Sequence, residues 1–317
     1  MDIDNLKKIS DKIRAYVILS ITIAQSGHPG GSLSVADIIT TLYFHKLHHD
    51  SKNPKWKYRD RFVLSKGHSC PAVYTALALK GYFGLDELKF LRKFNPNNPE
   101  ILHLQGHPDA LLTPGIEAST GSLGQGLSIA VGMALAEKID RKDNNKQEYE
   151  IYALLGDGEC NEGQIWEAVM SAGHYKSDNL TAIVDRNRLQ IDGNTEEVMS
   201  LNLIGKKFES FGWDVIEIDG HDFEQILNAL NKQHVQDKPK VIIANTTKGK
   251  GVKFMENKAE WHGKAPNFSE CIEALKDLGF LDKNSKIYKN KDIEKYKNNK
   301  EKQKEIYLNL FDKISGL

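Results

Sequence analysis

Apolar residues in the first 80 positions recur mainly at helical spacing. They predict a helix over residues 5–26, which a glycine-rich loop beginning at Gly27 ends abruptly, and a second helix over residues 35–45 with Ser34 as its N-cap. The pattern then predicts a short strand and another helix, over residues 61–64 and 72–80.

From Gly121 onward, predicted strands and helices alternate. The strands lie at 149–155, 180–184, 213–218 and 240–245, and the helices at 122–139, 162–175, 201–211 and 223–233. Strands that alternate with helices indicate right-handed βαβ crossovers. The predicted fold class is therefore α/β, a doubly wound, mostly parallel sheet with helices on both faces, whose ligands bind at the carboxyl ends of the strands.

Two segments lack this pattern. Residues 94–113 contain several Pro and Asn without a clear period, so we expect an extended loop with a functional role. Residues 283–305 are dominated by Lys, Asn and Glu and precede an amphipathic stretch over 306–314. We therefore expect one domain over residues 1–270 and a weakly packed, Lys/Asn-rich helical tail over residues 271–317.

The composition narrows the possible function classes. The 317 residues carry 43 basic and 43 acidic side chains, so there is no basic excess of the kind that nucleic-acid or membrane-surface binding requires. The apolar runs are too short for a membrane protein. Three cysteines without a CxxC pair indicate neither a disulfide framework nor a zinc site, and the acidic first residues are unlike a signal peptide. We expect a cytoplasmic protein.

The strongest chemical signal stands at the end of the predicted strand 149–155, where Asp157 lies between two glycines. The next predicted strand ends shortly before Asn187. Neighbouring parallel strands end at one edge of a sheet, so the carboxylate and the amide oxygen are expected to meet there. Such oxygens beside a helix N-terminus form a site for a hard divalent ion that also holds phosphate oxygens. A GDG sequence alone more commonly marks a tight turn.

These motifs together resemble the amino-terminal half of transketolase. In that family, GDG and a later asparagine form the signature for thiamine diphosphate and its magnesium ion. The resemblance covers roughly residues 10–270, and its further motifs are SGHPGG from Ser26, SKGH from Ser65, STGSLGQG from Ser119 and WHGKAP from Trp261. It implies the thiamine diphosphate-binding fold, with this chain as the diphosphate-binding domain.

The resemblance also implies a cofactor site. Asp157 and Asn187 match the side-chain ligands of Mg²⁺, or of Ca²⁺ or Mn²⁺ in its place, and Leu189 matches a residue that offers its backbone carbonyl. Gly158 matches a backbone contact to the diphosphate, and Gly121, Ser122 and Leu123 match the loop whose backbone holds the aminopyrimidine. Lys248 matches a lysine that is found in only one branch of the family.

Four histidines, each next to a glycine at a predicted loop position, are candidates for chemistry, namely His28, His68, His107 and His262. Imidazole can move protons near neutral pH. The resemblance implies that His68 and His262 contact the diphosphate and line the substrate channel. It implies that His28 and His107 bind sugar hydroxyls and assist proton transfer. The other seven histidines keep a structural interpretation.

Two interpretations of Glu162 remain open. An acid in the first turn of a helix is favoured by the helix dipole, which is a purely structural role. In the resembling family, the matching glutamate instead joins a carboxylate network across a dimer interface.

The resemblance implies a transferase that moves a two-carbon ketol unit from xylulose 5-phosphate to ribose 5-phosphate or erythrose 4-phosphate, in the pentose phosphate pathway. Family members complete the site with a second, pyrimidine-binding domain, for which the segment after Pro266 leaves no room. We therefore expect a self-associating amino-terminal subunit that is active in a heterotetramer with a separate carboxy-terminal subunit. The alternatives are a split enzyme for another ketose or a 2-oxo acid, and a non-catalytic cofactor-binding module.

Overall fold

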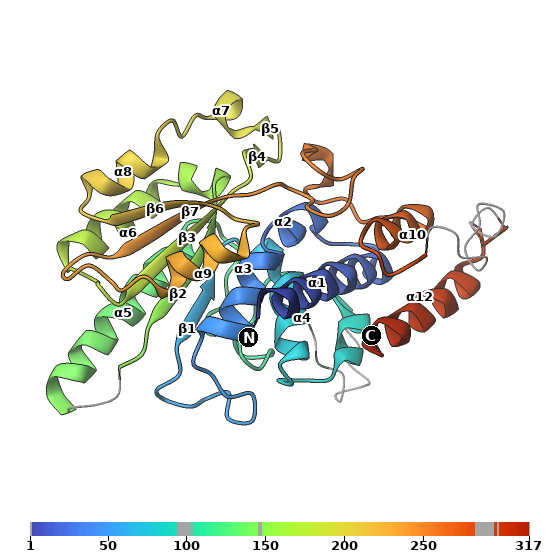
Figure 1. Cartoon of the computed structure of the whole chain (residues 1–317), viewed down its shortest axis with the longest axis horizontal. Helices are drawn as coiled ribbons and strands as arrows, with labels where there is room; N and C mark the ends of the chain where they lie inside the picture. Colours follow the sequence, from blue (N-terminus) through green and yellow to red (C-terminus); the bar gives the residue numbers. More distant parts are fainter. Residues whose placement is uncertain are drawn as a thin grey trace.

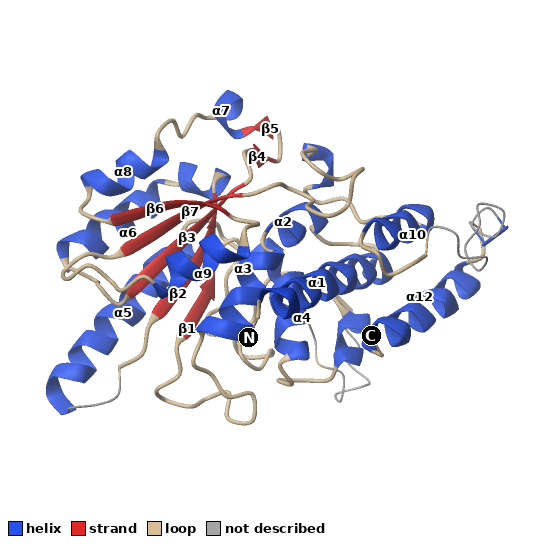
Figure 2. Ribbon diagram, in the orientation of Figure 1, coloured by secondary structure: helices blue, strands red, loops and turns tan. Residues whose placement is uncertain are grey.

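The residues that the computed structural model describes are organised around one parallel sheet (Figures 1 and 2). They are residues 2–93, 102, 104–144, 148–282, 295–296 and 298–316. The strand order is β1-β2-β3-β7-β6, and all neighbours run parallel. The strands are Arg61–Leu64 (β1), Ile151–Gly156 (β2), Leu180–Arg186 (β3), Asp214–Asp219 (β6) and Lys240–Asn245 (β7). The predicted α/β fold class is confirmed.

Helices cover both faces of this sheet. Alternate residues of β2 enter two different apolar clusters, with Tyr152 and Leu154 in one and Ala153 and Leu155 in the other. One face packs against α1 (Ile3–Ala24), α3 (Ala36–Thr41), α4 (Cys70–Leu79) and α9 (Phe223–Asn231), and the other against α5 (Gln125–Asn144), α6 (Gly163–His174) and α8 (Ile204–Ser210). Burial on both faces explains why the central strands are continuous apolar runs.

The helix predicted over residues 35–45 is present over nearly the same residues, but the glycine-rich loop expected before it is itself partly helical and Ser34 is not an N-cap. The chain forms α2 (Pro29–Ser34), α3 and a π-helical turn (Leu42–Lys46) in succession. Ser34 is the last residue of α2 and not an N-cap, because its hydroxyl donates to Asp185 Oδ2 at 2.8 Å.

Several short elements were not predicted. They are the antiparallel pair β4 (Leu189–Gln190) and β5 (Gly193–Asn194), the helix α7 (Thr195–Val198), and the 3-10 turns Gly67–Ser69, Leu85–Phe90, Gly158–Asn161 and Ala259–Trp261. Much of the predicted loop over 94–113 lies outside the described residues, namely 94–101 and 103.

A buried ion pair joins the N-terminal helices. Arg14 Nη2 of α1 lies 2.6 Å from Asp37 Oδ2 of α3, and both side chains are almost fully buried. His221 Nδ1 lies 2.7 Å from the same carboxylate oxygen, while its Nε2 accepts a hydrogen bond from the Thr247 backbone at 2.8 Å. The pair therefore also anchors the segment that leaves β7.

The last helices of the chain pack on α1. Residues of α10 (Phe268–Asp277) and α12 (Lys300–Ser315) belong to the same apolar cluster as α1. Phe311 of α12 is fully buried, and its ring centroid lies 4.7 Å from that of Tyr16. The division of the chain at residue 270 stays a prediction.

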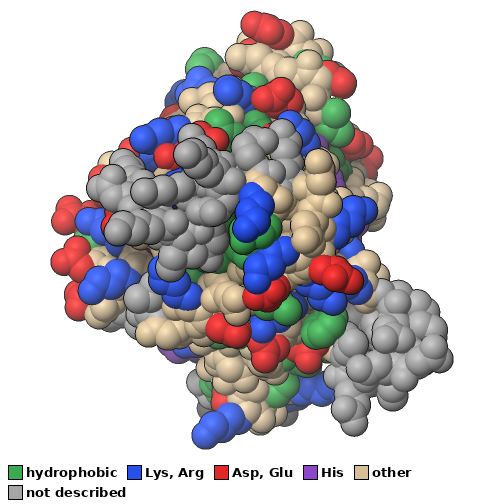
Figure 3. Space-filling model, turned by 90° about the vertical axis from the view of Figure 1, so that its right-hand side faces the viewer, with side chains coloured by type: hydrophobic (Ala, Val, Ile, Leu, Met, Phe, Trp, Pro, Cys, Tyr) green, Lys and Arg blue, Asp and Glu red, His purple; other side chains and the backbone are tan. Residues whose placement is uncertain are grey.

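The surface shows no segregation of charge on the face drawn in Figure 3, where basic and acidic side chains are intermixed among the coloured atoms. Within the described ranges, no helix has the length and apolar character that a membrane span requires. Cys70, Cys160 and Cys271 are buried free thiols.

Replacing Phe311 by Ala tests how firmly the C-terminal helix is attached. Loss of a fully buried phenyl ring should lower the free energy of unfolding by about 3–5 kcal/mol, measured by urea denaturation. Asn309→Ala, at an exposed position of the same helix, is the control. If the free energy of unfolding falls by no more than about 0.5 kcal/mol in both variants, the result would support the weakly packed tail expected from the sequence.

Candidate functional site

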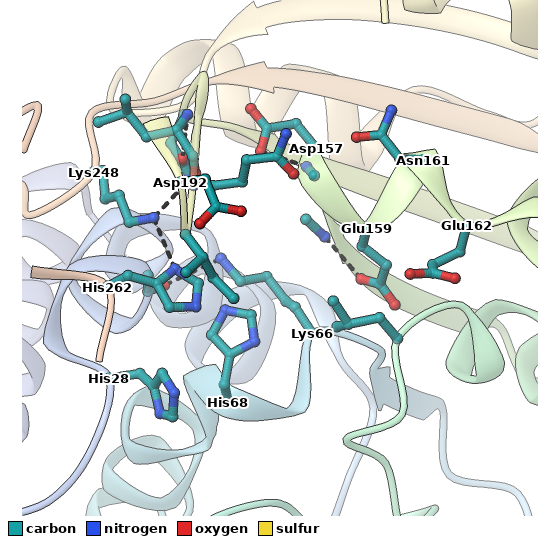
Figure 4. A pocket seen from close by; sticks show the side chains of 18 of the residues that line it. His28, Lys66, His68, Asp157, Glu159, Asn161, Glu162, Asp192, Lys248 and His262 are labelled. Atoms are coloured by element: carbon teal, nitrogen blue, oxygen red, sulfur yellow. Dashed lines mark hydrogen bonds between the residues drawn. The ribbon is translucent and has the colours of Figure 1, made fainter. Parts of the chain in front are cut away.

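A cavity of about 380 Å³ lies at the carboxyl edge of the sheet. Four neighbouring strands end there, and the residues that follow β1, β2, β3 and β7 line it. Figure 4 shows His28, His68 and His262 grouped on one side of the cavity, with Asp157 across from them. Parallel sheets bind their ligands at this edge, so the cavity is the candidate active site.

The structure brings together all but one of the predicted site residues. Those that line the cavity are His28, His68, His107, Gly121, Leu123, Asp157, Gly158, Asn187, Leu189, Lys248 and His262. Ser122 is exposed and is not among the lining residues. These residues come from eight separate parts of the chain, so their convergence is a property of the fold.

The three predicted metal ligands follow two paired strands. Asp157 Oδ1 accepts a hydrogen bond from Gly158 N at 2.8 Å, and its Oδ2 accepts one from Arg188 N at 2.5 Å. Asn187 Oδ1 accepts one from Leu189 N at 3.1 Å. The turn after β3 therefore bends back onto the Asp157 carboxylate.

The chemistry of these donors fits a hard divalent cation. The Asp157 carboxylate is almost fully buried, and no cationic side chain in the described part of the chain forms an ion pair with it. Burial and the neighbouring Asp185 raise the pKa of Asp157 to about 6, so a cation would stabilise the charged form. The described residues contain no group of three His, Cys, Asp or Glu side chains arranged for a metal. The donors here are instead one carboxylate, one amide oxygen and one carbonyl, which suit Mg²⁺ or Ca²⁺.

Histidines form the opposite wall. The ring centroid of His28 lies 5.3 Å from that of His68, 5.4 Å from that of His262 and 6.3 Å from that of His107. Burial, then the nearby Arg92, lowers the pKa of His28 to about 4, and burial, then Lys248, lowers that of His262 to about 3. The pKa values of His68 and His107 are lowered in the same direction, mainly by burial. This wall is therefore made of neutral imidazoles at pH 7.

Contacts outside the wall set the tautomer of two rings. Arg92 Nη2 lies 3.2 Å from His28 Nδ1, and a guanidinium can only donate. Lys248 Nζ lies 2.9 Å from His262 Nδ1, and a charged ammonium likewise only donates. In each neutral ring, Nδ1 is therefore the acceptor and Nε2 carries the proton.

Lys248 is almost fully buried and joins both walls. Its Nζ also donates to the Leu189 carbonyl at 3.0 Å, which is the predicted backbone ligand. A carbonyl oxygen has two lone pairs, so this hydrogen bond leaves one for a cation. Burial, then Lys66, lowers the pKa of Lys248 to about 8.

A second buried carboxylate holds the GDG turn in place. Glu159 Oε1 accepts hydrogen bonds from Ser65 Oγ at 2.5 Å and from Gly124 N at 2.9 Å, while its Oε2 accepts one from Gly156 N at 2.9 Å. Glu159 thereby joins the ends of β1 and β2 to the loop before α5. The sequence analysis missed it, although its place in the GDGE sequence was a usable signal.

Two glycines permit close approaches around the cavity. Gly121 has φ +152°, and a Cβ there would lie 2.9 Å from the His107 ring. A Cβ at Gly30 would lie 2.8 Å from the Trp261 carbonyl oxygen. Any larger residue at these two positions would displace His107 or the loop that carries His262.

Glu162 is the N-cap residue of α6 and lines the cavity, yet its side chain makes no capping hydrogen bond. The structural interpretation, which rests on the helix dipole and needs no such hydrogen bond, stays a prediction. The interface interpretation stays a prediction.

Other residues in and around the cavity were also missed. Lys66 is the lysine of the SKGH motif, but no role was predicted for it, and Gln190 has a buried amide nitrogen for which the described residues offer no partner. Arg92 lies at the edge of the predicted irregular loop, where no periodic signal marked it.

Comparison with known proteins identifies the class of this fold and site. Residues 5–313 match the family model described as transketolase, thiamine diphosphate binding domain. The chain belongs to this family, and the resemblance predicted from its motifs is confirmed.

Among its relatives, the chain is 43% identical over 279 residues to one of the subunits of apulose-4-phosphate transketolase from Phocaeicola vulgatus, covering 88% of this chain and 95% of that protein. It is 46% identical over 259 residues to 6-deoxy-6-sulfo-D-fructose transketolase subunit SqwG of a Clostridium species. This match covers 81% of this chain and 90% of that protein. It is 40% identical over 259 residues to human transketolase, covering 82% of this chain and 40% of the human protein.

A crystal structure of transketolase from Campylobacter jejuni superposes with a TM-score of 0.82 at 33% identity. The match covers 99% of this chain and 49% of that one, so the chain spans about half the length of this structural relative.

Replacing Arg92 by Met should raise the pKa of His28 from about 4 toward its ordinary value, because one of the positive charges beside the ring is removed. Burial, the larger cause, remains, so the rise should be partial. An NMR titration of the histidine ring signals measures the shift. His262, whose pKa is lowered by burial and Lys248 and not by Arg92, is the internal control. Equal shifts in both rings, or none in His28, would contradict this account.

Proposed function

We propose that this chain is the thiamine diphosphate-binding subunit of a transketolase composed of two different chains. The observation that carries the proposal is one cavity that is lined by Asp157, Asn187 and Leu189 and also by a group of neutral histidines. Family membership supports thiamine diphosphate as the cofactor of this cavity.

The extent of the similarity supports the division into two chains. Two relatives named as transketolase subunits match over 95% and 90% of their lengths, whereas human transketolase matches over only 40%. In the proposal, a separate carboxy-terminal subunit with a pyrimidine-binding domain completes the site. The same proposal holds that this chain associates with a second copy of itself and with two carboxy-terminal subunits to form a heterotetramer. It also places the protein in the cytoplasm and in the pentose phosphate pathway.

The chain's own residues bind and orient the cofactor. When bound, thiamine diphosphate supplies carbanion stabilisation, which is the difficult part of ketol transfer. Asp157, Asn187 and the Leu189 carbonyl are the proposed ligands of Mg²⁺, with Ca²⁺ or Mn²⁺ as substitutes. Contacts to the cofactor are further proposed for His68, Gly121, Ser122, Leu123, Gly158, Lys248 and His262.

The histidines are proposed to act on the sugar. His28 and His107 hold hydroxyl groups, and His68 and His262 line the channel beside the diphosphate. Because Arg92 holds His28 Nδ1 as an acceptor, the proton that His28 can donate is on Nε2. Low pKa values keep all four rings neutral at pH 7, so each can donate a hydrogen bond without adding charge.

The proposed substrates are a ketose phosphate donor and an aldose phosphate acceptor, such as xylulose 5-phosphate with ribose 5-phosphate or erythrose 4-phosphate. A second candidate is a split transketolase for another ketose. It is favoured by two relatives at 43% and 46% identity, whose names specify apulose-4-phosphate and 6-deoxy-6-sulfo-D-fructose.

Asp157→Ala should weaken Mg²⁺-dependent binding of thiamine diphosphate to the purified chain by about tenfold or more, since even residues that only support metal ligands cost this much. Isothermal titration calorimetry measures the affinity. Asp214→Ala removes a carboxylate at the start of β6, at the opposite edge of the sheet, and should leave the affinity unchanged. Unchanged binding by Asp157→Ala would refute the proposed cation site.

The chain alone, with thiamine diphosphate and Mg²⁺, should bind the cofactor but not convert xylulose 5-phosphate and ribose 5-phosphate. A coupled assay should detect turnover only when a carboxy-terminal transketolase subunit is added. Offering other ketoses to the same mixture identifies the donor. Enzyme-like rates from the chain alone would contradict the need for a partner. Cofactor binding without turnover of any ketose in the completed complex would favour the non-catalytic module.

A further inference from the structure

A buried ion pair adjoins the proposed cation site, because its carboxylate contacts the side chain of Asn187. Lys66, which follows β1, places Nζ 2.5 Å from Asp185 Oδ2 near the end of β3. Asp185 is completely buried and Lys66 is 1% exposed. None of the roles proposed above uses either residue, and burying two charges is costly unless further hydrogen bonds compensate.

Asp185 is the centre of a larger set of contacts. Its carboxylate accepts hydrogen bonds from Ser34 Oγ at 2.8 Å, from Thr246 Oγ1 and from Asn187 Nδ2 at 2.8 Å. These donors lie on α2, on the segment after β7 and on the turn after β3. The carboxylate therefore fixes three parts of the cavity lining at once.

The contact to Asn187 has a chemical consequence. An amide carries one donor nitrogen and one acceptor oxygen, so a contact that fixes the nitrogen also fixes the oxygen. With Nδ2 on Asp185, Oδ1 lies on the side of the Leu189 backbone, where it accepts the Leu189 N–H at 3.1 Å. Rotating the amide by a half turn would place its oxygen against the Asp185 carboxylate, which is repulsive.

The charges have a second consequence. Asp157 directly follows β2, and Asp185 lies near the end of β3. These two strands are neighbours in the sheet, and Gly156 pairs with Asp185. Two carboxylates this close repel each other, and the ammonium of Lys66 neutralises one of them. Asp157 is left as the uncompensated anion that faces the cavity.

We propose that Asp185 and Lys66 are positioning residues for the divalent cation. Asp185 turns the amide oxygen of Asn187 toward the cation, and Lys66 balances the charge of Asp185 so that the carboxylate can remain buried. This inference rests on the proposed function, because it assumes that Asp157 and Asn187 hold the ion.

Substitutions of the two residues should differ in their effect on cation affinity. Asp185→Asn leaves the Lys66 ammonium unbalanced beside the site and removes the acceptor charge that orients Asn187, so Mn²⁺ binding should weaken by about tenfold or more. Lys66→Met leaves an additional anion near the site, so Mn²⁺ binding should be retained or tightened. Both single variants should lose stability, because each leaves one buried charge without its partner.

The experiment measures free Mn²⁺ by electron paramagnetic resonance, with the purified chain at a fixed thiamine diphosphate concentration. Protein-free samples correct for Mn²⁺ held by the cofactor itself. Ser34→Ala is the matched control, because it removes one hydrogen bond to the same carboxylate without changing charge. It should change Mn²⁺ affinity much less than Asp185→Asn. Urea unfolding of every variant gives its stability independently.

Weaker Mn²⁺ binding by Asp185→Asn with retained or tighter binding by Lys66→Met, together with a loss of stability in both variants, would support the proposal. Wild-type affinity in Asp185→Asn, or equal weakening in Lys66→Met, would overturn it in favour of a purely structural pair. If Asp185→Asn does not fold, the double variant that carries both Asp185→Asn and Lys66→Met is compared with Lys66→Met alone. Weaker Mn²⁺ binding in the double variant supports the role of Asp185, and equal binding overturns it.

Asp157→Ala separates this inference from the proposed function. If Asp157→Ala binds Mn²⁺ like the wild type, the cation site itself is wrong. If Asp157→Ala loses binding while Asp185→Asn retains it, only the positioning role fails.

Discussion

Parallel pairing of β1, β2, β3 and β7 brings four strand ends to one edge of the sheet, and the whole cavity depends on that edge. Each strand delivers polar residues directly after its last buried position. A carboxylate, an amide, a lysine and the SKGH segment can therefore meet although the chain between them is long. The helices on both faces make this edge accessible, because they bury the faces and leave the ends of the strands open.

Buried carboxylates hold this edge together. Glu159 joins the GDG turn to the end of β1, Asp185 joins β3 to α2 and to the segment after β7, and Asp37 joins α1 and α3 to His221. Each accepts several hydrogen bonds or an ion pair, which is the condition under which a charge is tolerated in the interior. The loops of the cavity are therefore fixed by the same groups that place charge beside it.

Much of this arrangement could be predicted from local sequence. The strands that end before Asp157 and Asn187 are apolar runs followed by polar residues, so both the parallel sheet and the meeting of these two residues followed from periodicity. The contacts between distant segments could not be predicted in this way. Nothing near Ser34 shows that its hydroxyl bonds Asp185, and a serine before an apolar stretch has the ordinary pattern of an N-cap. Arg92 was missed for a related reason, since its partner His28 lies on another segment.

The tautomers of the histidine wall bear on which sugars the proposed site would accept. His28 and His262 each have Nδ1 occupied as an acceptor, so each offers a single uncharged N–H. An uncharged donor binds the oxygen of a hydroxyl whatever the configuration of the carbon that carries it, provided that the oxygen comes within reach. If sugars bind here as proposed, such a wall would recognise polyhydroxylated chains as a class and leave stereochemical selection to other contacts. This tolerance suits a family in which relatives carry the names of different ketoses.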